Sequence, residues 1–251
     1  MAENVGAPGR RSGDGSLADV ALLRPVRTGN AFEETVELLL RAIKLGVVSP
    51  GERLPAEREL STRLSVSRVT LREALRALEN EGYVDVKRGR YGGTFIHETL
   101  PRPKRPSKRD RPAAGELEDV LTIREVLEPG AAAAAAGREL GDREITILNK
   151  RLADCERVGD TAEYRRMDSR LHLTIAEMSG SASLVAAVAD VRVRTNALLD
   201  CIPRLSSNLD HSNKQHQRII TAIERGEPER ARNAMSEHLA ATAALLRGFL
   251  S

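Results

Sequence analysis

Near the start of the chain, apolar side chains recur at helical spacing in three stretches, residues 31–46, 56–64 and 68–82. A break at residues 65–67 separates the last two, and Ser67 is a suitable N-cap for the helix that follows. Alternating apolar and polar residues in 83–86 and 94–97 flank a glycine-rich turn, which predicts a β-hairpin. Two short helices joined by a tight turn and followed by a hairpin are typical of a winged helix-turn-helix that reads DNA.

From residue 116 onward the apolar positions keep the helical period, and no strand-like alternation occurs. Short connections containing Gly or Pro would join the helices into an antiparallel bundle. The predicted fold class is therefore mainly α, with a winged helix-turn-helix of three helices and a small β-hairpin followed by an all-α antiparallel bundle. The bundle helices are predicted at residues 116–138, 142–158, 160–179, 181–201, 206–225 and 228–249.

A basic, proline-rich segment separates the two patterns. Residues 99–114 hold six basic residues, one acidic residue and four prolines. Spaced prolines favour an extended linker, which could touch DNA phosphates or act as a solvated spacer. We therefore expect a disordered tail over 1–25, a DNA-binding domain over 26–98, this linker, and a helical effector-binding domain over 115–251.

Composition narrows the class of protein further. The 251 residues include three Phe, three Tyr and no Trp, which argues against an aromatic platform for single-stranded nucleic acid. The two cysteines, Cys155 and Cys201, lie far apart, which argues against a disulfide scaffold or a cysteine zinc module. No apolar run reaches the roughly 20 residues of a membrane span, and residues 1–16 lack the apolar core of a secretory signal. We expect a cytoplasmic protein with no membrane partner.

Arginines concentrate where a winged helix-turn-helix faces DNA. Arg68 and Arg72 begin the third predicted helix, Arg58 lies on the helix before it, and Arg88 and Gly89 lie in the hairpin turn. An arginine can bond guanine bidentately, for roughly 1–3 kcal/mol of discrimination per base pair. The alternative is ordinary surface charge balanced by neighbouring glutamates.

Three histidines and an aspartate recur at spacings that could bring them together. Asp168 and His172 are four residues apart on an apolar helix face. His216 and His238 lie ten residues before and ten residues after the turn at 226–228, so antiparallel helices would place both about 15 Å from that turn. One carboxylate and three imidazoles would suit Zn²⁺, Ni²⁺, Mn²⁺ or Fe²⁺.

The alternative for each histidine is a surface group or a satisfied core group. We assign His97 and His211 to that class. The same alternative stays open for the four-residue set when spacing alone is considered.

The chain resembles two linked families. Its first half contains G-V-V-S-P-G-E-R-L-P, E-R-E-L, V-S-R-x-T-L-R-E-A-L-R-x-L and G-G-T-F, and looks like the DNA-binding domain of GntR-type transcription factors. Its second half resembles the FCD domain of the FadR subfamily. The matching segments there are R-E-V-L-E (124–128), D-S-R-L-H-L-T-I-A (168–176), H-Q-R-I-I-T-A-I-E-R-G-E (216–227) and A-M-S-E-H-L (234–239).

The first resemblance implies a set of DNA contacts at Arg58, Arg68, Thr70, Arg72, Arg88 and Gly89. Val69 is a departure, because many relatives have Thr there. An apolar contact to a thymine methyl group could replace the missing hydroxyl contact.

The second resemblance implies metal ligands at Asp168, His172, His216 and His238. It also implies a metal-containing pocket for a small effector, often a carboxylate or sugar acid. The acyl-CoA-responsive branch lacks this metal set, so the intact set argues against a fatty-acyl effector. Zn²⁺ is the first choice of metal. Arg124 is the first candidate for binding the effector, followed by Arg192 and Asn196. An ion pair with Glu128 on the same helix is an equal alternative for Arg124.

The resulting interpretation is a homodimeric transcriptional regulator, more usually a repressor, that reads a pseudo-palindromic double-stranded operator. A small effector would change its operator affinity. The alternative is a metal-dependent hydrolase tethered to DNA. The sequence contains no H-E-x-x-H, G-x-S-x-G or phosphate-binding loop, so we expect no enzymatic activity.

Overall fold

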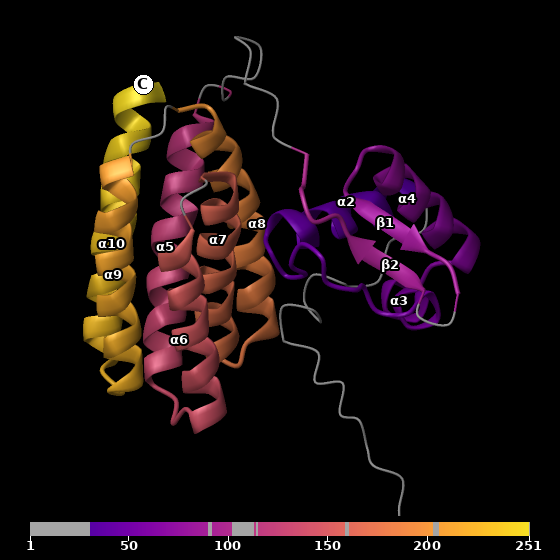
Figure 1. Ribbon diagram of the computed structural model, residues 1–251. Coiled ribbons are helices and arrows are strands. Elements are labelled where there is room, and N and C mark those ends of the chain that lie inside the picture. Colours follow the sequence, from indigo (N-terminus) through magenta and orange to yellow (C-terminus); the bar gives the residue numbers. More distant parts are fainter. Residues whose placement is uncertain are drawn as a thin grey trace, which may run out of the picture.

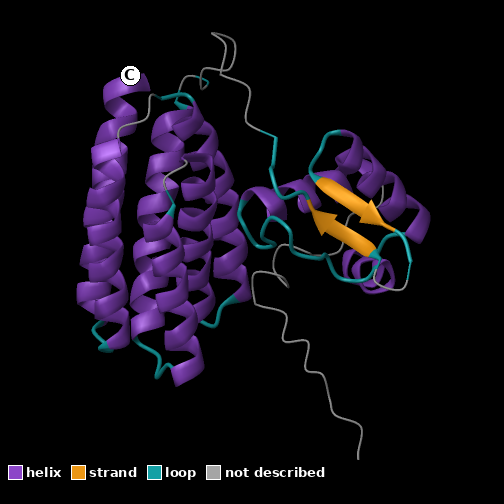
Figure 2. Ribbon diagram, in the orientation of Figure 1, coloured by secondary structure: helices purple, strands orange, loops and turns teal. Residues whose placement is uncertain are grey.

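The computed structural model describes residues 31–89, 92–101, 113, 115–158, 161–202 and 206–250. Within these ranges, a small N-terminal domain lies beside a bundle of long helices (Figure 1). The strands belong to the N-terminal domain, and the bundle is helical throughout its described part (Figure 2). The predicted tail and residues 102–112 of the predicted linker lie outside the described residues, so the domain boundaries stay predictions.

The N-terminal domain has the predicted helix-turn-helix and hairpin. Its strands pair antiparallel, with Val84 opposite Ile96. Strand β1 begins one residue later, and β2 one residue earlier, than the alternation predicts. The elements are α2 (Ala31–Lys44), α3 (Glu57–Leu64), α4 (Arg68–Asn80), β1 (Val84–Lys87) and β2 (Gly93–Ile96).

Local contacts fix the turn between α3 and α4. Ser65 adopts a left-handed conformation (φ 54°) after the last turn of α3. The Ser67 side chain then accepts a hydrogen bond from the Thr70 backbone N–H at 3.0 Å and so caps α4, as predicted. Leucines from all three helices pack against Val84 and Ile96 to form the core of this domain.

The C-terminal domain contains the predicted antiparallel helices, and each end lies within two residues of its predicted position. Its core consists mainly of Ala, Leu, Ile and Met side chains. Within the described ranges, no helix is long and apolar enough to cross a membrane. The elements are α5 (Glu116–Ala136), α6 (Asp142–Arg157), α7 (Thr161–Met178), α8 (Ala182–Asp200), α9 (Ser206–Glu224) and α10 (Pro228–Leu250).

The end of α2 joins the two domains. Leu45 is fully buried (0% exposed) and belongs to a cluster with Leu173 of α7 and Val188 of α8. Arg41 forms an ion pair with Asp190 on α8. Helix α8 therefore forms the side of the bundle that faces the N-terminal domain (Figure 1).

Gly46 brings the backbone of α2 close to α7. Its φ is +67°, and a Cβ atom built there would lie 3.0 Å from the carbonyl oxygen of Arg166. Glycine thus provides both the left-handed turn that ends the helix and the room for this approach. Arg166 precedes Asp168 by two residues, so the contact lies close to the candidate metal ligands.

Candidate metal centre and DNA interface

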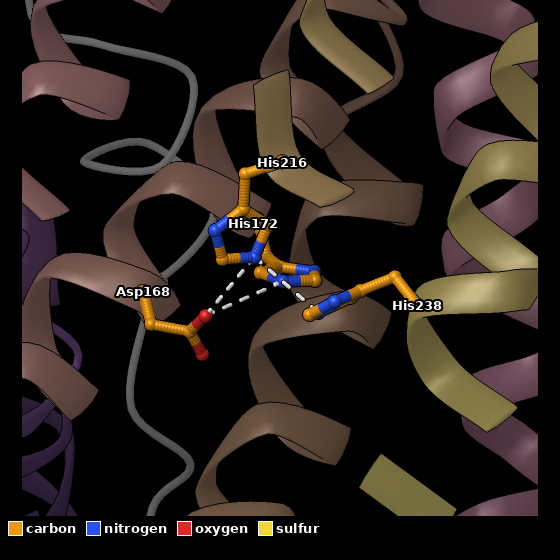
Figure 3. A group of neighbouring side chains, drawn as sticks. All are labelled: Asp168, His172, His216 and His238. Carbon is orange, nitrogen blue, oxygen red and sulfur yellow. Dashed lines mark hydrogen bonds and ion pairs between the residues drawn. The ribbon is translucent and has the colours of Figure 1, made fainter. Parts of the chain in front are cut away.

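The four predicted ligands lie together in the interior of the bundle (Figure 3). Asp168 and His172 come from α7, His216 from α9 and His238 from α10. One potential ligand atom from each residue lies within 4.8 Å of every other, and all four side chains are buried. The helical spacing thus brings His216 and His238 to the same level, as expected.

Each of the three imidazoles points its Nε2 toward the other ligands. His216 Nε2 lies 3.3 Å from His238 Nε2 and 3.3 Å from Asp168 Oδ1. His172 Nε2 lies 3.7 Å from the same carboxylate oxygen. Three Nε2 atoms and one carboxylate oxygen therefore face a common point (Figure 3).

The protonation states at this site suit a metal centre. Burial lowers the pKa of His172 and holds the pKa of His238 well below its ordinary value, which favours neutral imidazoles. Although burial opposes ionisation of Asp168, the adjacent Arg192 guanidinium holds its pKa well below the usual range. Neutral imidazole and ionised carboxylate are the forms that coordinate metals.

A second group of side chains contacts the outer side of the cluster. Glu128, on α5, contacts His172 Nδ1, and Gln215 Oε1 lies 3.1 Å from His238 Nδ1. His216 Nδ1 makes no hydrogen bond to any described residue. Gln215 was not among the predicted site residues, and Glu128 was predicted only as a partner of Arg124, because both of these contacts run between helices.

Two of the three effector candidates lie beside this cluster. Arg124 and Arg192 are each 1% exposed. Arg124 Nε donates to Glu128 Oε1 at 2.7 Å, which is the ion pair given as its alternative. Arg192 contacts the second oxygen of Asp168. Arg124 Nη1 and Arg192 Nε are buried and make no hydrogen bond to the described residues.

The third candidate, Asn196, is connected to Arg192 through the hydroxyl group of Ser169. Its Nδ2 donates to Ser169 Oγ at 2.9 Å. Arg192 also donates to this hydroxyl oxygen, at 3.3 Å. Asn196 lines a cavity of about 220 Å³ between the two domains, together with residues such as Leu45 and Tyr83.

The predicted DNA contacts lie on the outer side of the N-terminal domain. Arg58, Arg68, Arg88 and Gly89 are exposed. Arg72 is exposed as well, and its Nε donates to Glu57 Oε2 at 2.7 Å.

The start of α4 presents two further side chains. The Thr70 hydroxyl is 2.8 Å from Ser67 Oγ, which places it within the N-cap of the helix. Val69 is 65% exposed despite its apolar side chain. It therefore does not contribute to the core of this domain.

Comparison with known proteins gives the family. Residues 32–96 match bacterial regulatory proteins of the gntR family, and residues 119–241 match the FCD domain. The chain is 32% identical over 211 residues to the Uxu operon regulator of Haemophilus influenzae, covering 81% of this chain and 77% of that protein. This chain is a GntR-family transcriptional regulator with an FCD domain.

A second relative is also named as a transcriptional regulator. This GntR regulator is 28% identical to the HTH-type transcriptional repressor NanR of Klebsiella aerogenes, covering 89% of this chain and 88% of that protein. Its fold is similar to that of E. coli McbR/YncC, with a TM-score of 0.54 and 20% identity, covering 88% of this chain and 99% of that one. Family membership confirms the interpretation as a regulator rather than an enzyme.

Proposed function

We propose that this GntR regulator senses a small anion through a divalent cation in its FCD domain. Asp168, His172, His216 and His238 would hold the cation. The anion would complete the coordination and change the affinity of the N-terminal domain for its operator. The convergence of three Nε2 atoms and one carboxylate oxygen in the bundle interior is the observation that carries this proposal.

The donor set supports a borderline transition metal. Imidazole nitrogens together with one carboxylate suit Zn²⁺, and also Ni²⁺, Mn²⁺ or Fe²⁺. Hard cations such as Mg²⁺ and Ca²⁺ prefer sets made of oxygen ligands. Four protein ligands leave a coordination position for an exogenous ligand on a cation that accepts five or six ligands. We propose Zn²⁺ as the first metal to test.

The charges around the cluster favour an anionic ligand. Two carboxylates, Asp168 and Glu128, are balanced by two guanidinium groups, Arg124 and Arg192, all of them buried. A divalent cation would add two positive charges to this neutral group, and uncompensated buried charge is costly. A carboxylate would offset that charge and could accept hydrogen bonds from Arg124 Nη1 and Arg192 Nε. We therefore propose a small carboxylate or sugar acid as the effector.

The two domains are connected through the helices that carry the cluster. Helix α7 supplies Asp168 and helix α8 supplies Arg192, and the end of α2 packs between the same two helices through Leu45. A shift of either helix when the anion binds would therefore act directly on the N-terminal domain. We propose that a homodimer reads a pseudo-palindromic operator and acts as a repressor. The name of the Klebsiella relative describes a repressor.

The proposal can be tested with the full-length protein in zinc-loaded and chelator-stripped forms. An operator is first selected from random double-stranded DNA, and its affinity is then measured with a panel of small carboxylates and sugar acids. The matched control for each acid is its neutral amide. We expect one acid to raise the melting temperature and change operator affinity only in the zinc-loaded form. Failure of the wild-type protein to retain any of Zn²⁺, Ni²⁺, Mn²⁺ and Fe²⁺ would refute the metal centre.

A further inference from the structure

We infer that Glu128 is a positioning residue for the proposed metal centre. Its carboxylate holds the His172 imidazole with Nε2 toward the other ligands and strengthens that nitrogen as a donor to the cation. This inference rests on the proposed function, because it assigns a role to a residue that does not itself face the cation.

The geometry around His172 supports this role. Glu128 Oε2 contacts His172 Nδ1, and the opposite ring nitrogen, Nε2, faces Asp168 Oδ1 at 3.7 Å. A neutral imidazole carries one N–H and one lone pair. When the Nδ1–H donates to a carboxylate, the lone pair is left on Nε2, where a cation can accept it. A carboxylate behind a ligating histidine fixes its tautomer and raises its basicity in many metal sites.

Arg124 keeps the Glu128 carboxylate in place. Arg124 lies one helical turn before Glu128 on α5, and its Nε donates to Glu128 Oε1 at 2.7 Å. The other carboxylate oxygen, Oε2, contacts His172 Nδ1, so the two oxygens have different partners. The structure thus contains a continuous chain from Arg124 through Glu128 to His172.

The other histidines provide a comparison within the same site. His238 Nδ1 faces the neutral amide oxygen of Gln215 at 3.1 Å. His216 contacts a carboxylate, that of Asp168, through Nε2 rather than through Nδ1. A carboxylate is a stronger acceptor than an amide. Among these three, His172 is therefore the imidazole whose donor strength is raised by a negative charge.

A substitution series separates the charge of Glu128 from its shape. Glu128→Gln keeps an oxygen that can accept the Nδ1–H but removes the charge, whereas Glu128→Ala removes both. Glu125→Gln is the matched control, because Glu125 lies on the same helix and is exposed. The dissociation constant for Zn²⁺ is measured by competition with a chelator, using full-length protein. We expect it to rise roughly 10–100-fold in Glu128→Gln, to rise further in Glu128→Ala, and to stay unchanged in Glu125→Gln.

A second measurement does not depend on metal binding or on the folding of a variant. Nitrogen-15 NMR of the metal-free wild-type protein reports which ring nitrogen of His172 carries the proton. We expect the Nδ1–H tautomer. The Nε2–H tautomer, or a Glu128→Gln protein that binds zinc as tightly as wild type, would overturn the inference. Wild-type protein that binds none of Zn²⁺, Ni²⁺, Mn²⁺ and Fe²⁺ would refute the metal centre instead, and the tautomer would still decide how His172 is oriented.

Discussion

Replacing Leu45 with alanine tests how strongly the N-terminal domain is held against the bundle. The side chain is 0% exposed and packs with α7 and α8 through Leu173 and Val188. Truncating a leucine in such a site costs about 2–5 kcal/mol. Because this contact lies between the domains, most of the loss should fall on their docking, and the core of each domain should stay intact.

The expected loss is large enough to separate the domains. A change of about 2.8 kcal/mol lowers the equilibrium constant for docking roughly a hundredfold. In calorimetry we expect the wild-type protein to unfold in one cooperative step and the Leu45→Ala protein to unfold in two. Small-angle X-ray scattering should give a larger radius of gyration for the variant. The response of operator affinity to the carboxylate effector should be reduced or lost, while operator affinity without effector is retained.

The matched control is Glu37→Ala, because Glu37 lies on α2 and its side chain is exposed. This control should behave as wild type in calorimetry, scattering and the effector response. If Leu45→Ala gave the same results as Glu37→Ala, the contact between α2 and the bundle would not transmit the signal. The proposed route through α7 and α8 would then be refuted.

Three further predictions concern the DNA interface, the ligand set and the dependence on pH. Arg68→Ala should weaken operator binding by roughly 1–3 kcal/mol without lowering the melting temperature, and unchanged affinity by fluorescence anisotropy would show that α4 is not the recognition helix. The double variant Asp168→Ala/His238→Ala should contain no zinc by mass spectrometry, and retained stoichiometry would exclude this ligand set. Burial in the folded protein lowers the pKa values of His172 and His238. Below about pH 6.5 the unfolded chain therefore binds more protons than the folded chain does. The free energy of unfolding of the metal-free protein should therefore decrease from pH 7 to pH 5 in urea titrations, and a flat profile would contradict these shifts.

Much of the fold could be predicted because its helices carry strong local signals. The Ser67 N-cap and the glycine and proline breaks determine where helices begin and end, so the predicted ends differ little from those observed. The pairing of His216 with His238 was also predictable, since both are equally far from one tight turn. That argument needs only the rise of a helix and an antiparallel partner.

The contacts between distant elements could not be predicted in the same way. In the sequence, Leu45 is an ordinary apolar residue near the end of a helix, and no pattern in the neighbouring residues indicates that it is buried against α7 and α8. The four-residue spacing of Arg124 and Glu128 on α5 predicts an ion pair between them. Nothing in that spacing indicates that Glu128 also contacts His172. Both roles depend on how helices pack across the bundle, which the helical period does not determine.

The four candidate ligands are spread over 71 residues of the chain, from Asp168 to His238. A cation bound there would cross-link α7, α9 and α10, and the unfolded chain has no such site. By mass action, free cation at a hundred times its dissociation constant would add about 2.7 kcal/mol to the stability of the folded state. The lifetime of this regulator in the cell, and hence its abundance, would then follow the supply of the metal as well as the supply of its effector.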